Sequence, residues 1–467
     1  MYLSDTIVAL ATPPGQGAVA IIRLSGPRAI EIAHTLWHPV VPGRRPERSE
    51  HSSEKRKLRL GEIRDPATGA TIDRALCVMM RSPRSLTGED VAELHCHGGV
   101  YLVHRILGLA AAAGARMAEP GEFSRRAFLN GRIDLTAAEA VADLVAARGE
   151  SALKLAIAQL GGALESRVTT MREQVIAIRA HLEAAIDFAD EDLPLPSPDQ
   201  IAGDISRLIG DLTLLHDSFA RGRMMRQGAR AAIIGKPNAG KSSVLNLILG
   251  TDRAIVTPIP GTTRDVIEDS VQFGPWPVVL QDTAGLRESR DEVERIGIDR
   301  TRRCAAEADL IIAVFDSSRP FEPEDADVIG IAHGRPGVAL INKRDLPQLL
   351  GVDELAGYGL ALPPVDFCAL TASGIAELRV QIERQIETIA GDTRADGAAL
   401  SRERHRAAVA TALGGLEAAR TSVISAIPPE IVAVDIALAA DALASITGEV
   451  STEDVLDAVF REFCIGK

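Results

Sequence analysis

Apolar and polar positions divide the chain into four stretches of different periodicity. Up to about residue 120, short apolar runs such as 19–24 alternate with turns that contain glycine and proline, which predicts a mixed α/β domain. From about 121 to 222, apolar residues recur at three- and four-residue steps, the spacing of one helix face. From about 223 to 386, apolar strands alternate with helical stretches, as in a parallel sheet, and residues 387–467 return to alanine-rich helix. The pattern predicts a multidomain chain in which an α/β domain interrupts a helical one.

The first helical stretch carries two apolar stripes on either side of the proline-rich segment 193–198. We interpret both stripes as the core of a helix bundle, in preference to a membrane face or a cofactor face. The first stripe comprises Leu153, Ile157, Leu160, Leu164, Val168, Met171, Val175 and Ile178, and the second comprises Ile201, Ile205, Leu208, Ile209, Leu212 and Leu215.

Composition favours a soluble protein of the cytoplasm. Of the 467 residues, 46% are hydrophobic and 25% are charged, and no apolar run approaches the ~18 residues of a membrane span. The first residues lack the basic and apolar regions of a secretory signal. Five scattered cysteines argue for a reducing compartment. The net charge of -13 argues against a generally sticky nucleic-acid binder but leaves room for one basic groove.

A phosphate-binding loop is predicted at 235–243, where Gly-Lys-Pro-Asn-Ala-Gly-Lys-Ser-Ser follows an apolar run and leads into a helical pattern. Its glycines let the backbone N–H groups approach phosphates at the helix N-terminus. We expect Lys241 to reach the β- and γ-phosphates and the Ser242 hydroxyl to bind Mg²⁺. The loop residues expected to touch the nucleotide are Asn238, Ala239, Gly240, Lys241, Ser242 and Ser243.

Four further segments follow in the order that a guanine-nucleotide switch requires. The carboxylate of Asp345 can accept hydrogen bonds from N1–H and the 2-amino group of guanine, a pairing that adenine cannot offer. The ordered set therefore predicts GTP in preference to ATP. The segments are the first switch (Thr257, Pro258, Ile259, Pro260, Gly261, Thr262, Thr263), the Mg²⁺ and γ-phosphate segment (Asp282, Thr283, Ala284, Gly285), the base-reading segment (Asn342, Lys343, Asp345) and the loop over guanine (Cys368, Ala369, Leu370).

The position after Gly285 departs from Ras-like proteins, because Leu286 replaces the glutamine that orients the attacking water. Glu294 on the second switch is one candidate for this task, and its alternative is a solvated helix charge. Asn238 could instead ligate a monovalent cation beside the phosphates, which would stabilise developing charge as an arginine finger does. Should no cation act, Arg264 and Arg287 are the next candidates.

The run His95-Cys96-His97 has two interpretations. It is either a metal site or a polar strand end beside the glycine turn at 98–99. In a strand, Cys96 would point away from both histidines, and the sequence has no second ligand cluster with zinc spacing. We therefore favour the strand end.

Several motifs outside the nucleotide segments resemble those of the MnmE (TrmE) family of bacterial tRNA-modification GTPases, and the resemblance spans essentially the whole chain. They lie at 5–15, 86–90, 120–124 and 126–130 and in the terminal Phe463-Cys-Ile-Gly-Lys467. The resemblance implies an N-terminal α+β domain similar to tetrahydrofolate-binding proteins that forms a homodimer. It also implies a helical domain made of two separated segments and a Ras-like G domain inserted between them.

The resemblance further implies a function. Family members act with the FAD-dependent partner MnmG to add an aminomethyl or carboxymethylaminomethyl group to C5 of the wobble uridine of certain tRNAs. A folate such as 5-formyltetrahydrofolate supplies the carbon. The GTPase is expected to depend on potassium and on G-domain dimerisation. The alternative is a GTPase of RNA or ribosome assembly whose flanking domains only bind partners.

Individual roles also follow from the resemblance. Residues matching folate contacts are Arg23, Glu93, Arg132 and Lys467, with arginine at 132 where a lysine can occur. Residues matching the metal sites are Asn238, Thr257, Ile259 and Thr262 for K⁺, and Ser242 and Thr263 for Mg²⁺. Residues matching catalytic positions are Lys241, Glu294 and Cys464, although a buried tail residue is the alternative for Cys464. Cys368 stands where a serine is usual.

Overall fold

The computed structural model describes residues 5–40, 57–188, 194–251, 270–282, 302–391, 396–461, 463, 465 and 466. These residues form two compact units. The first holds the described residues up to Ala142 and those from Thr447 onward, and the second holds the residues between. Among the described residues, no helix is long and apolar enough to cross a membrane. The domain boundaries near 120, 222 and 386 stay predictions.

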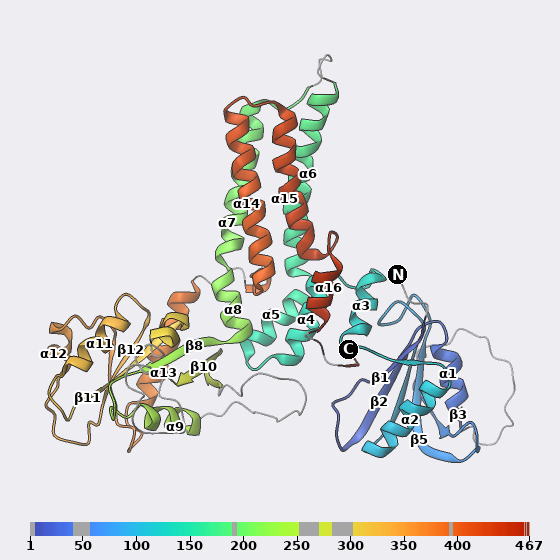
Figure 1. Cartoon of the computed structure of the whole chain (residues 1–467), viewed down its shortest axis with the longest axis horizontal. Helices are drawn as coiled ribbons and strands as arrows, with labels where there is room; N and C mark the ends of the chain where they lie inside the picture. Colours follow the sequence, from blue (N-terminus) through green and yellow to red (C-terminus); the bar gives the residue numbers. More distant parts are fainter. Residues whose placement is uncertain are drawn as a thin grey trace. The chain divides into compact units, whose positions relative to one another are not determined.

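A seven-stranded sheet forms the body of the first unit (Figure 1). The strand order is β3-β4-β5-β6-β2-β1-β7, and all pairs are antiparallel except β1 with β7. The strands are β1 (Ile7–Leu10), β2 (Gly17–Ser25), β3 (Trp37–Pro39), β4 (Arg59–Arg64), β5 (Thr71–Met80), β6 (Val91–Gly98) and β7 (Arg116–Met117).

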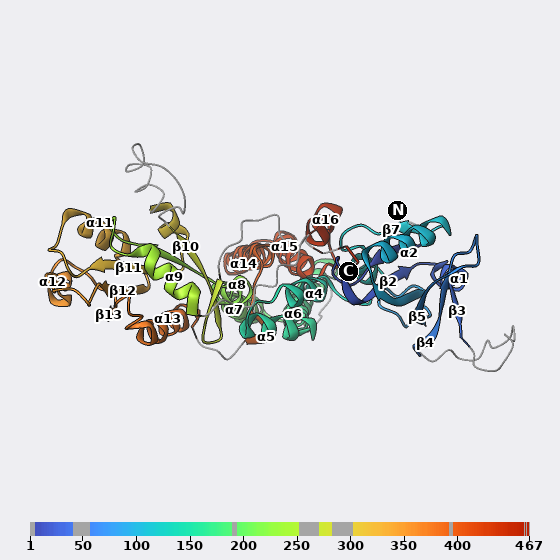
Figure 2. The ribbon, with the colours of Figure 1, turned by 90° about the horizontal axis from the view of Figure 1, so that it is seen from below.

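Buried and partly exposed side chains alternate along β2, and the buried ones show which face of the sheet the helices cover. Ile22 and Leu24 are fully buried and pack with residues of helices α1 (Ala29–Leu36) and α2 (Val100–Ala112), which lie on one side of the strands (Figure 2). Arg23 lies between them in sequence and points to the opposite face, because successive side chains of a strand alternate. Its direct partner in the register of β2 and β6 is Glu93. The sheet thus brings together two of the predicted folate residues, which are 70 positions apart.

The end of the chain returns to this unit. Phe460, in helix α16 (Glu453–Arg461), and Phe463 are buried in a cluster with Leu135 of helix α4 (Leu135–Ala146). Ile465 pairs with Pro120 in an isolated antiparallel bridge, just before helix α3 (Glu122–Leu129). Phe460 and Phe463 are therefore part of a hydrophobic core in the first unit.

Four long helices form a bundle in the second unit (Figure 1). They are α6 (Ala163–Asp187), α7 (Pro198–Asp217), α14 (Glu403–Ile424) and α15 (Pro429–Thr447), and they share one hydrophobic core. The helix break at the proline-rich segment has a local cause, because Ser197 caps α7 and makes a reciprocal capping box with Gln200. The prediction that two separated segments build one helical domain is confirmed.

The predicted first stripe is wrong over its first turns. Leu153, Ile157 and Leu160 lie on helix α5 (Glu150–Leu160) and are 42%, 54% and 39% exposed. The stripe assumed one continuous helix, but the pair Gly161-Gly162 ends α5 and starts α6, and this break changes which face is buried. From Leu164 onward the predicted positions are in the core.

A six-stranded sheet in the order β13-β12-β11-β8-β10-β9 forms the other part of the second unit. It is parallel except for β9, and hydrophobic cores lie on both of its faces. This doubly covered sheet inserted between helical segments confirms the multidomain α/β and α architecture. The strands are β8 (Ala229–Ile234), β9 (Ser270–Phe273), β10 (Trp276–Asp282), β11 (Leu310–Asp316), β12 (Gly337–Asn342) and β13 (Pro364–Asp366), and the helices are α8 (Phe219–Gln227), α9 (Lys241–Thr251), α11 (Pro323–Ala332), α12 (Val352–Gly357) and α13 (Ile375–Ala390).

Candidate functional site

The predicted phosphate loop connects β8 to the N-terminus of α9, the position that the motif requires. Two glycines are needed for close packing. A β-carbon at Gly235 would lie 2.5 Å from the carbonyl oxygen of Val314, and one at Gly240, where φ is +102°, would collide with the Asn342 amide. Asn238 adopts φ of 61°, a left-handed conformation that asparagine tolerates. The loop backbone therefore has the conformation of a phosphate cradle.

Lys241 bonds within this loop. Its Nζ atom donates to the carbonyl oxygens of Gly235 and Lys236, both at 2.9 Å. An ammonium group held over the cradle by two neutral carbonyls can exchange these bonds for stronger ones to phosphate oxygens. The structure therefore shows Lys241 bonded within the loop, and its contact with the β- and γ-phosphates stays a prediction.

Asn342 links the phosphate loop to the predicted guanine loop. Its side chain is buried, its Nδ2 donates to the carbonyl oxygen of Ala239 at 2.8 Å, and its Oδ1 accepts from the N–H of Ala369 at 3.1 Å. The Lys343 ammonium lies 2.6 Å from Asp316 at the end of β11. The three segments that were predicted to bind phosphate and base thus lie at the carboxyl ends of β8, β12 and β13 in one parallel sheet, the edge where ligands bind in such sheets.

The base-reading carboxylate is exposed and already has a partner. Asp345 Oδ1 accepts a hydrogen bond from the thiol of Cys368 at 3.1 Å. Leu370 is 85% exposed and reaches no core. Cys368 therefore contacts the guanine-reading group through its side chain, which sequence reasoning did not foresee.

Several predicted residues lie outside the described residues, and their contacts stay predictions. Asp282 ends β10, but its side chain is also outside the description. The others are Thr257, Pro258, Ile259, Pro260, Gly261, Thr262, Thr263, Arg264, Thr283, Ala284, Gly285, Leu286, Arg287, Glu294, Cys464 and Lys467.

A second polar site lies on the face of the first unit's sheet opposite to α1 and α2, where Phe123 of α3 packs with Ile7 and Ala9 of β1. Arg23 Nε lies 2.8 Å from Glu93 Oε1, and His95 Nε2 lies 3.2 Å from the other oxygen of the same carboxylate. Arg23 also donates to the carbonyl oxygen of Gly466 at 3.3 Å, and its guanidinium carbon is 5.7 Å from the ring centre of Phe123. Arg23 and Glu93 thus meet beside the end of the chain.

Arg132 occupies a separate position. The stem of its side chain packs near Gly88, whose added β-carbon would lie 3.2 Å from Arg132 Cγ. Within the described part of the chain, no hydrogen bond or ion pair joins Arg132 to Arg23 or Glu93. Lys467, the fourth predicted folate residue, is outside the described residues.

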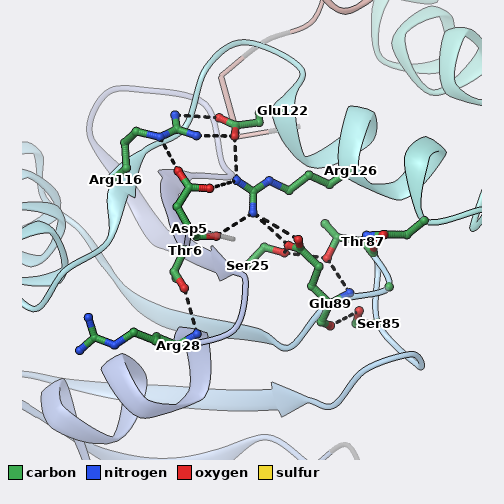
Figure 3. Close-up of polar contacts among 12 residues, drawn as sticks. Asp5, Thr6, Ser25, Arg28, Ser85, Thr87, Glu89, Arg116, Glu122 and Arg126 are labelled. Atoms are coloured by element: carbon green, nitrogen blue, oxygen red, sulfur yellow. Dashed lines mark hydrogen bonds and ion pairs between the residues drawn. The ribbon is translucent and has the colours of Figure 1, made fainter. Parts of the chain in front are cut away.

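A network of charged side chains supports this unit (Figure 3). Arg126, 5% exposed, donates to Asp5 Oδ1 at 2.7 Å, to Glu122 Oε1 at 2.9 Å and to Glu89 Oε2 at 3.2 Å. Arg116 bonds to the same Asp5 and Glu122 at 2.7 and 2.6 Å. The charged residues of this network come from the motifs at 5–15, 86–90, 120–124 and 126–130. Through Glu122 and Arg126, the network holds α3 in position.

The pKa values of the network reflect the balance between burial and pairing. Burial alone would raise the pKa of Asp5, but hydrogen bonds and charge from Arg116 and Arg126 outweigh it and hold the pKa below its ordinary value. Burial also opposes ionisation of Glu122, and Arg116, the Glu119 N–H and Arg126 lower its pKa in the same way. Both carboxyl groups are therefore ionised in the folded protein at neutral pH.

The run His95-Cys96-His97 is a strand end, as expected. Cys96 is buried in the core, and burial, with a contribution from Asp73, raises the pKa of its thiol to about 11. The His97 ring lies 2.7 Å from Asp73 on the other face of the strand. In the part of the chain that the structure describes, no group of His, Cys, Asp and Glu side chains could hold a metal ion.

Comparison with known proteins agrees with the geometry. Residues 135–464 match the family described as MnmE helical domain, and residues 6–132 match the family described as GTP-binding protein TrmE N-terminus. The tRNA modification GTPase MnmE of Chloroflexus aurantiacus is 43% identical over 467 residues, which cover 100% of both chains. Those of a Roseiflexus species and of Natranaerobius thermophilus are 42% and 39% identical, covering 100% and 99% of both chains.

Both flanking regions match their family descriptions, and the relatives match from end to end. The phosphate loop and the base-reading segment follow strands of one sheet, and Gly466 near the chain end lies beside Arg23 in the first unit. The chain belongs to the MnmE family of tRNA modification GTPases.

Proposed function

We propose that this GTPase works inside a complex that builds an aminomethyl or carboxymethylaminomethyl group on C5 of the wobble uridine of certain tRNAs. The complex would contain an FAD-dependent partner of the MnmG type. The observation that supports this proposal best is the second polar site, where Arg23 and Glu93 meet the chain end at Gly466. The alternative, a GTPase of RNA or ribosome assembly, gives no reason for the pairing of Arg23 and Glu93 beside the chain end.

The side chains of this second site fit a one-carbon folate such as 5-formyltetrahydrofolate. Glu93 is an acceptor for the amide and amino N–H groups of a pterin ring, and Arg23 beside it would hold that carboxylate in place. The cations of Arg132 and Lys467 can pair with the carboxylates of the glutamate tail. The Arg23 and Glu93 side chains are 18% and 16% exposed, so they are sheltered yet reachable. When bound, the folate would supply the carbon that is added to uridine. The side chains of this chain would bind and orient it.

Cys464 is proposed to act at this site. It lies between Phe463, which is buried, and Ile465, which pairs with Pro120. Replacing Cys464 with serine should abolish tRNA modification while leaving GTP hydrolysis intact, because the nucleotide loop lies in the other unit. If modification persists, Cys464 is a tail residue without a chemical role.

The face of the first unit's sheet opposite to α1 and α2 carries the proposed homodimer surface, on β2, β4 and β5. It presents apolar side chains to solvent: Val19 is 57% exposed, Leu60 is 55% exposed and Leu76 is 38% exposed. Exposed apolar groups gathered around a polar site are typical of protein interfaces. A dimer formed here would enclose the folate site from the open side.

At the nucleotide loop, Lys241 and the Ser242 hydroxyl would hold the phosphates and Mg²⁺. Asn238, with Thr257, Ile259 and Thr262 of the first switch, would supply oxygen ligands to K⁺. Thr263 would complete the Mg²⁺ ligands, and Glu294 would orient the attacking water. Pairing of two G domains would order the first switch and so couple hydrolysis to dimerisation.

Mass analysis of wobble uridines in tRNA tests the proposal. A strain lacking this chain should lose the modified uridines, and the intact gene should restore them. A Lys241→Ala version should fail to restore them, because it cannot hold the γ-phosphate. Unchanged uridines in the deletion strain would refute the proposal and favour the alternative, a GTPase of RNA or ribosome assembly. We place the protein in the cytoplasm, where its tRNA substrates are found.

A further inference from the structure

The nucleotide loop has an anchor beneath it that neither the motif nor the mechanism explains. Lys236, the second residue of the loop, is 5% exposed, although a lysine at this position has no phosphate to bind. Its Nζ lies 2.7 Å from Asp325 Oδ2 and 2.9 Å from Glu322 Oε2. The Asp325 side chain is fully buried in the first turn of α11, and Glu322 directly precedes that helix.

The main chain of Lys236 also makes hydrogen bonds within the nucleotide loop. Its carbonyl oxygen accepts from Lys241 Nζ at 2.9 Å and from the N–H of Ala239 at 3.3 Å. One residue therefore ties the cradle to α11 through its side chain and holds the phosphate-binding lysine through its carbonyl. A shift of Lys236 would move both the cradle and the resting position of Lys241.

The charges of this cluster also matter for an anionic ligand. Burial opposes the ammonium charge, but hydrogen bonds from Nζ to Asp325 and Glu322 outweigh burial and raise the pKa of Lys236. The Lys236 charge compensates the buried carboxylate of Asp325, which would otherwise repel a triphosphate from beneath the loop. The pair offsets the charge of Asp325, while Glu322 adds a second negative charge at the more exposed end of the cluster.

We infer that Lys236 is a positioning residue for GTP, and that its buried ion pair with Asp325 holds the phosphate cradle in its binding conformation before the nucleotide arrives. Preorganised donors lose little entropy on binding, so the pair should act on GTP affinity. The inference rests on GTP binding by the loop and not on the proposed uridine chemistry. Either can fail without the other.

The test separates positioning from simple stabilisation in the full-length protein. Lys236→Met leaves a buried carboxylate unpaired, so it should lower the unfolding midpoint and weaken GTP binding. The double variant Lys236→Met/Asp325→Leu removes both charges. It should recover the midpoint yet bind a fluorescent GTP analogue at least about tenfold more weakly than the parent, because the cradle has lost its anchor.

Two further variants serve as references. Lys236→Arg keeps the charge and should bind within about threefold of the parent. Lys154→Met makes the same chemical change at a lysine that is 70% exposed and paired with Glu150 on α5, and it should leave both readouts unchanged.

A double variant that binds GTP as tightly as the parent would overturn the inference and reduce the pair to a stabilising contact. If neither methionine variant folds, Asp325→Asn decides the question, because asparagine keeps an acceptor for Lys236 but removes the charge. We expect it to bind GTP several-fold more weakly in a protein that still folds, because Glu322 continues to pair with Lys236. Unchanged affinity would overturn the inference.

Discussion

The thiol of Cys368 lies 3.1 Å from Asp345 Oδ1, so the cysteine of the predicted guanine loop is hydrogen-bonded to the carboxylate that is predicted to read the base. Cys368 is buried, and its own N–H donates to the carbonyl oxygen of Ser373 at 3.1 Å, which closes the loop behind it. The thiol therefore fixes the direction in which an otherwise exposed carboxylate points.

Cys368→Ala removes this donor and should weaken GTP binding about three- to tenfold, the effect of losing one hydrogen bond of roughly 0.5–1.5 kcal/mol. Cys368→Ser keeps a donor of smaller size and should stay close to the parent. Titration with a fluorescent GTP analogue measures both. Cys304→Ala, at a cysteine that is only partly buried, is the control. Equal affinity of the alanine and serine variants would mean that the thiol does not orient Asp345.

Glu294→Ala tests the proposed water-orienting carboxylate. We expect hydrolysis to slow by roughly 10²- to 10³-fold while GTP binding stays nearly intact, because a general base acts on the transition state and not on the bound nucleotide. Single-turnover hydrolysis and nucleotide titration give the two numbers. Normal turnover in this variant would show that Glu294 is a surface charge without a role in hydrolysis.

Potassium dependence tests the proposed cation site at Asn238. Hydrolysis should be fast in KCl and slow in NaCl at equal ionic strength, because an oxygen cage of fixed size favours the larger ion. Asn238→Ala should show the slow rate in both salts. Equal rates of the parent protein in the two salts would refute the potassium mechanism and direct the search to Arg264 or Arg287.

Arg126→Met should destabilise the first unit by up to about 3–5 kcal/mol at pH 7. It removes the cation shared by Asp5, Glu89 and Glu122, although Asp5 and Glu122 keep a second partner in Arg116. The folded-state pKa values of Asp5 and Glu122 are depressed. The stabilisation is therefore complete above the ordinary carboxyl pKa of about 4, and it is lost as pH falls further.

Unfolding curves between pH 7 and pH 3 measure this dependence, and the difference between parent and variant should shrink as the pH falls. Arg179→Met breaks an exposed pair with Glu183 on α6 and should cost only about 0.5 kcal/mol at any pH. A difference that does not vary with pH would show that Arg126 acts through packing alone.

Local chemistry made the nucleotide loop predictable. The glycines at 235 and 240 and the lysine at 241 are close in sequence, and the strand and helix on either side are both read from short windows. The strand end at 95–97 was predictable for the same reason, because alternation alone assigns Cys96 to the core.

Other features depend on tertiary packing that the sequence does not reveal. The positions from Leu153 to Leu160 were assigned to the core because Gly161-Gly162 was not recognised as a break between two helices. The pair of Lys236 with Asp325 joins residues 89 positions apart, and each residue looks like an ordinary surface charge in its own segment. The same holds for Arg126 and Asp5, which are 121 positions apart.

Reconstitution of the modification reaction tests the central claim most directly. Purified protein, an FAD-dependent MnmG-type partner, unmodified tRNA and a one-carbon folate would be incubated with GTP, with GDP, or with a non-hydrolysable GTP analogue. We predict the C5-modified wobble uridine, detected by mass spectrometry, only with GTP. Its formation to the same extent with GDP or the analogue would contradict a GTPase whose hydrolysis serves tRNA modification.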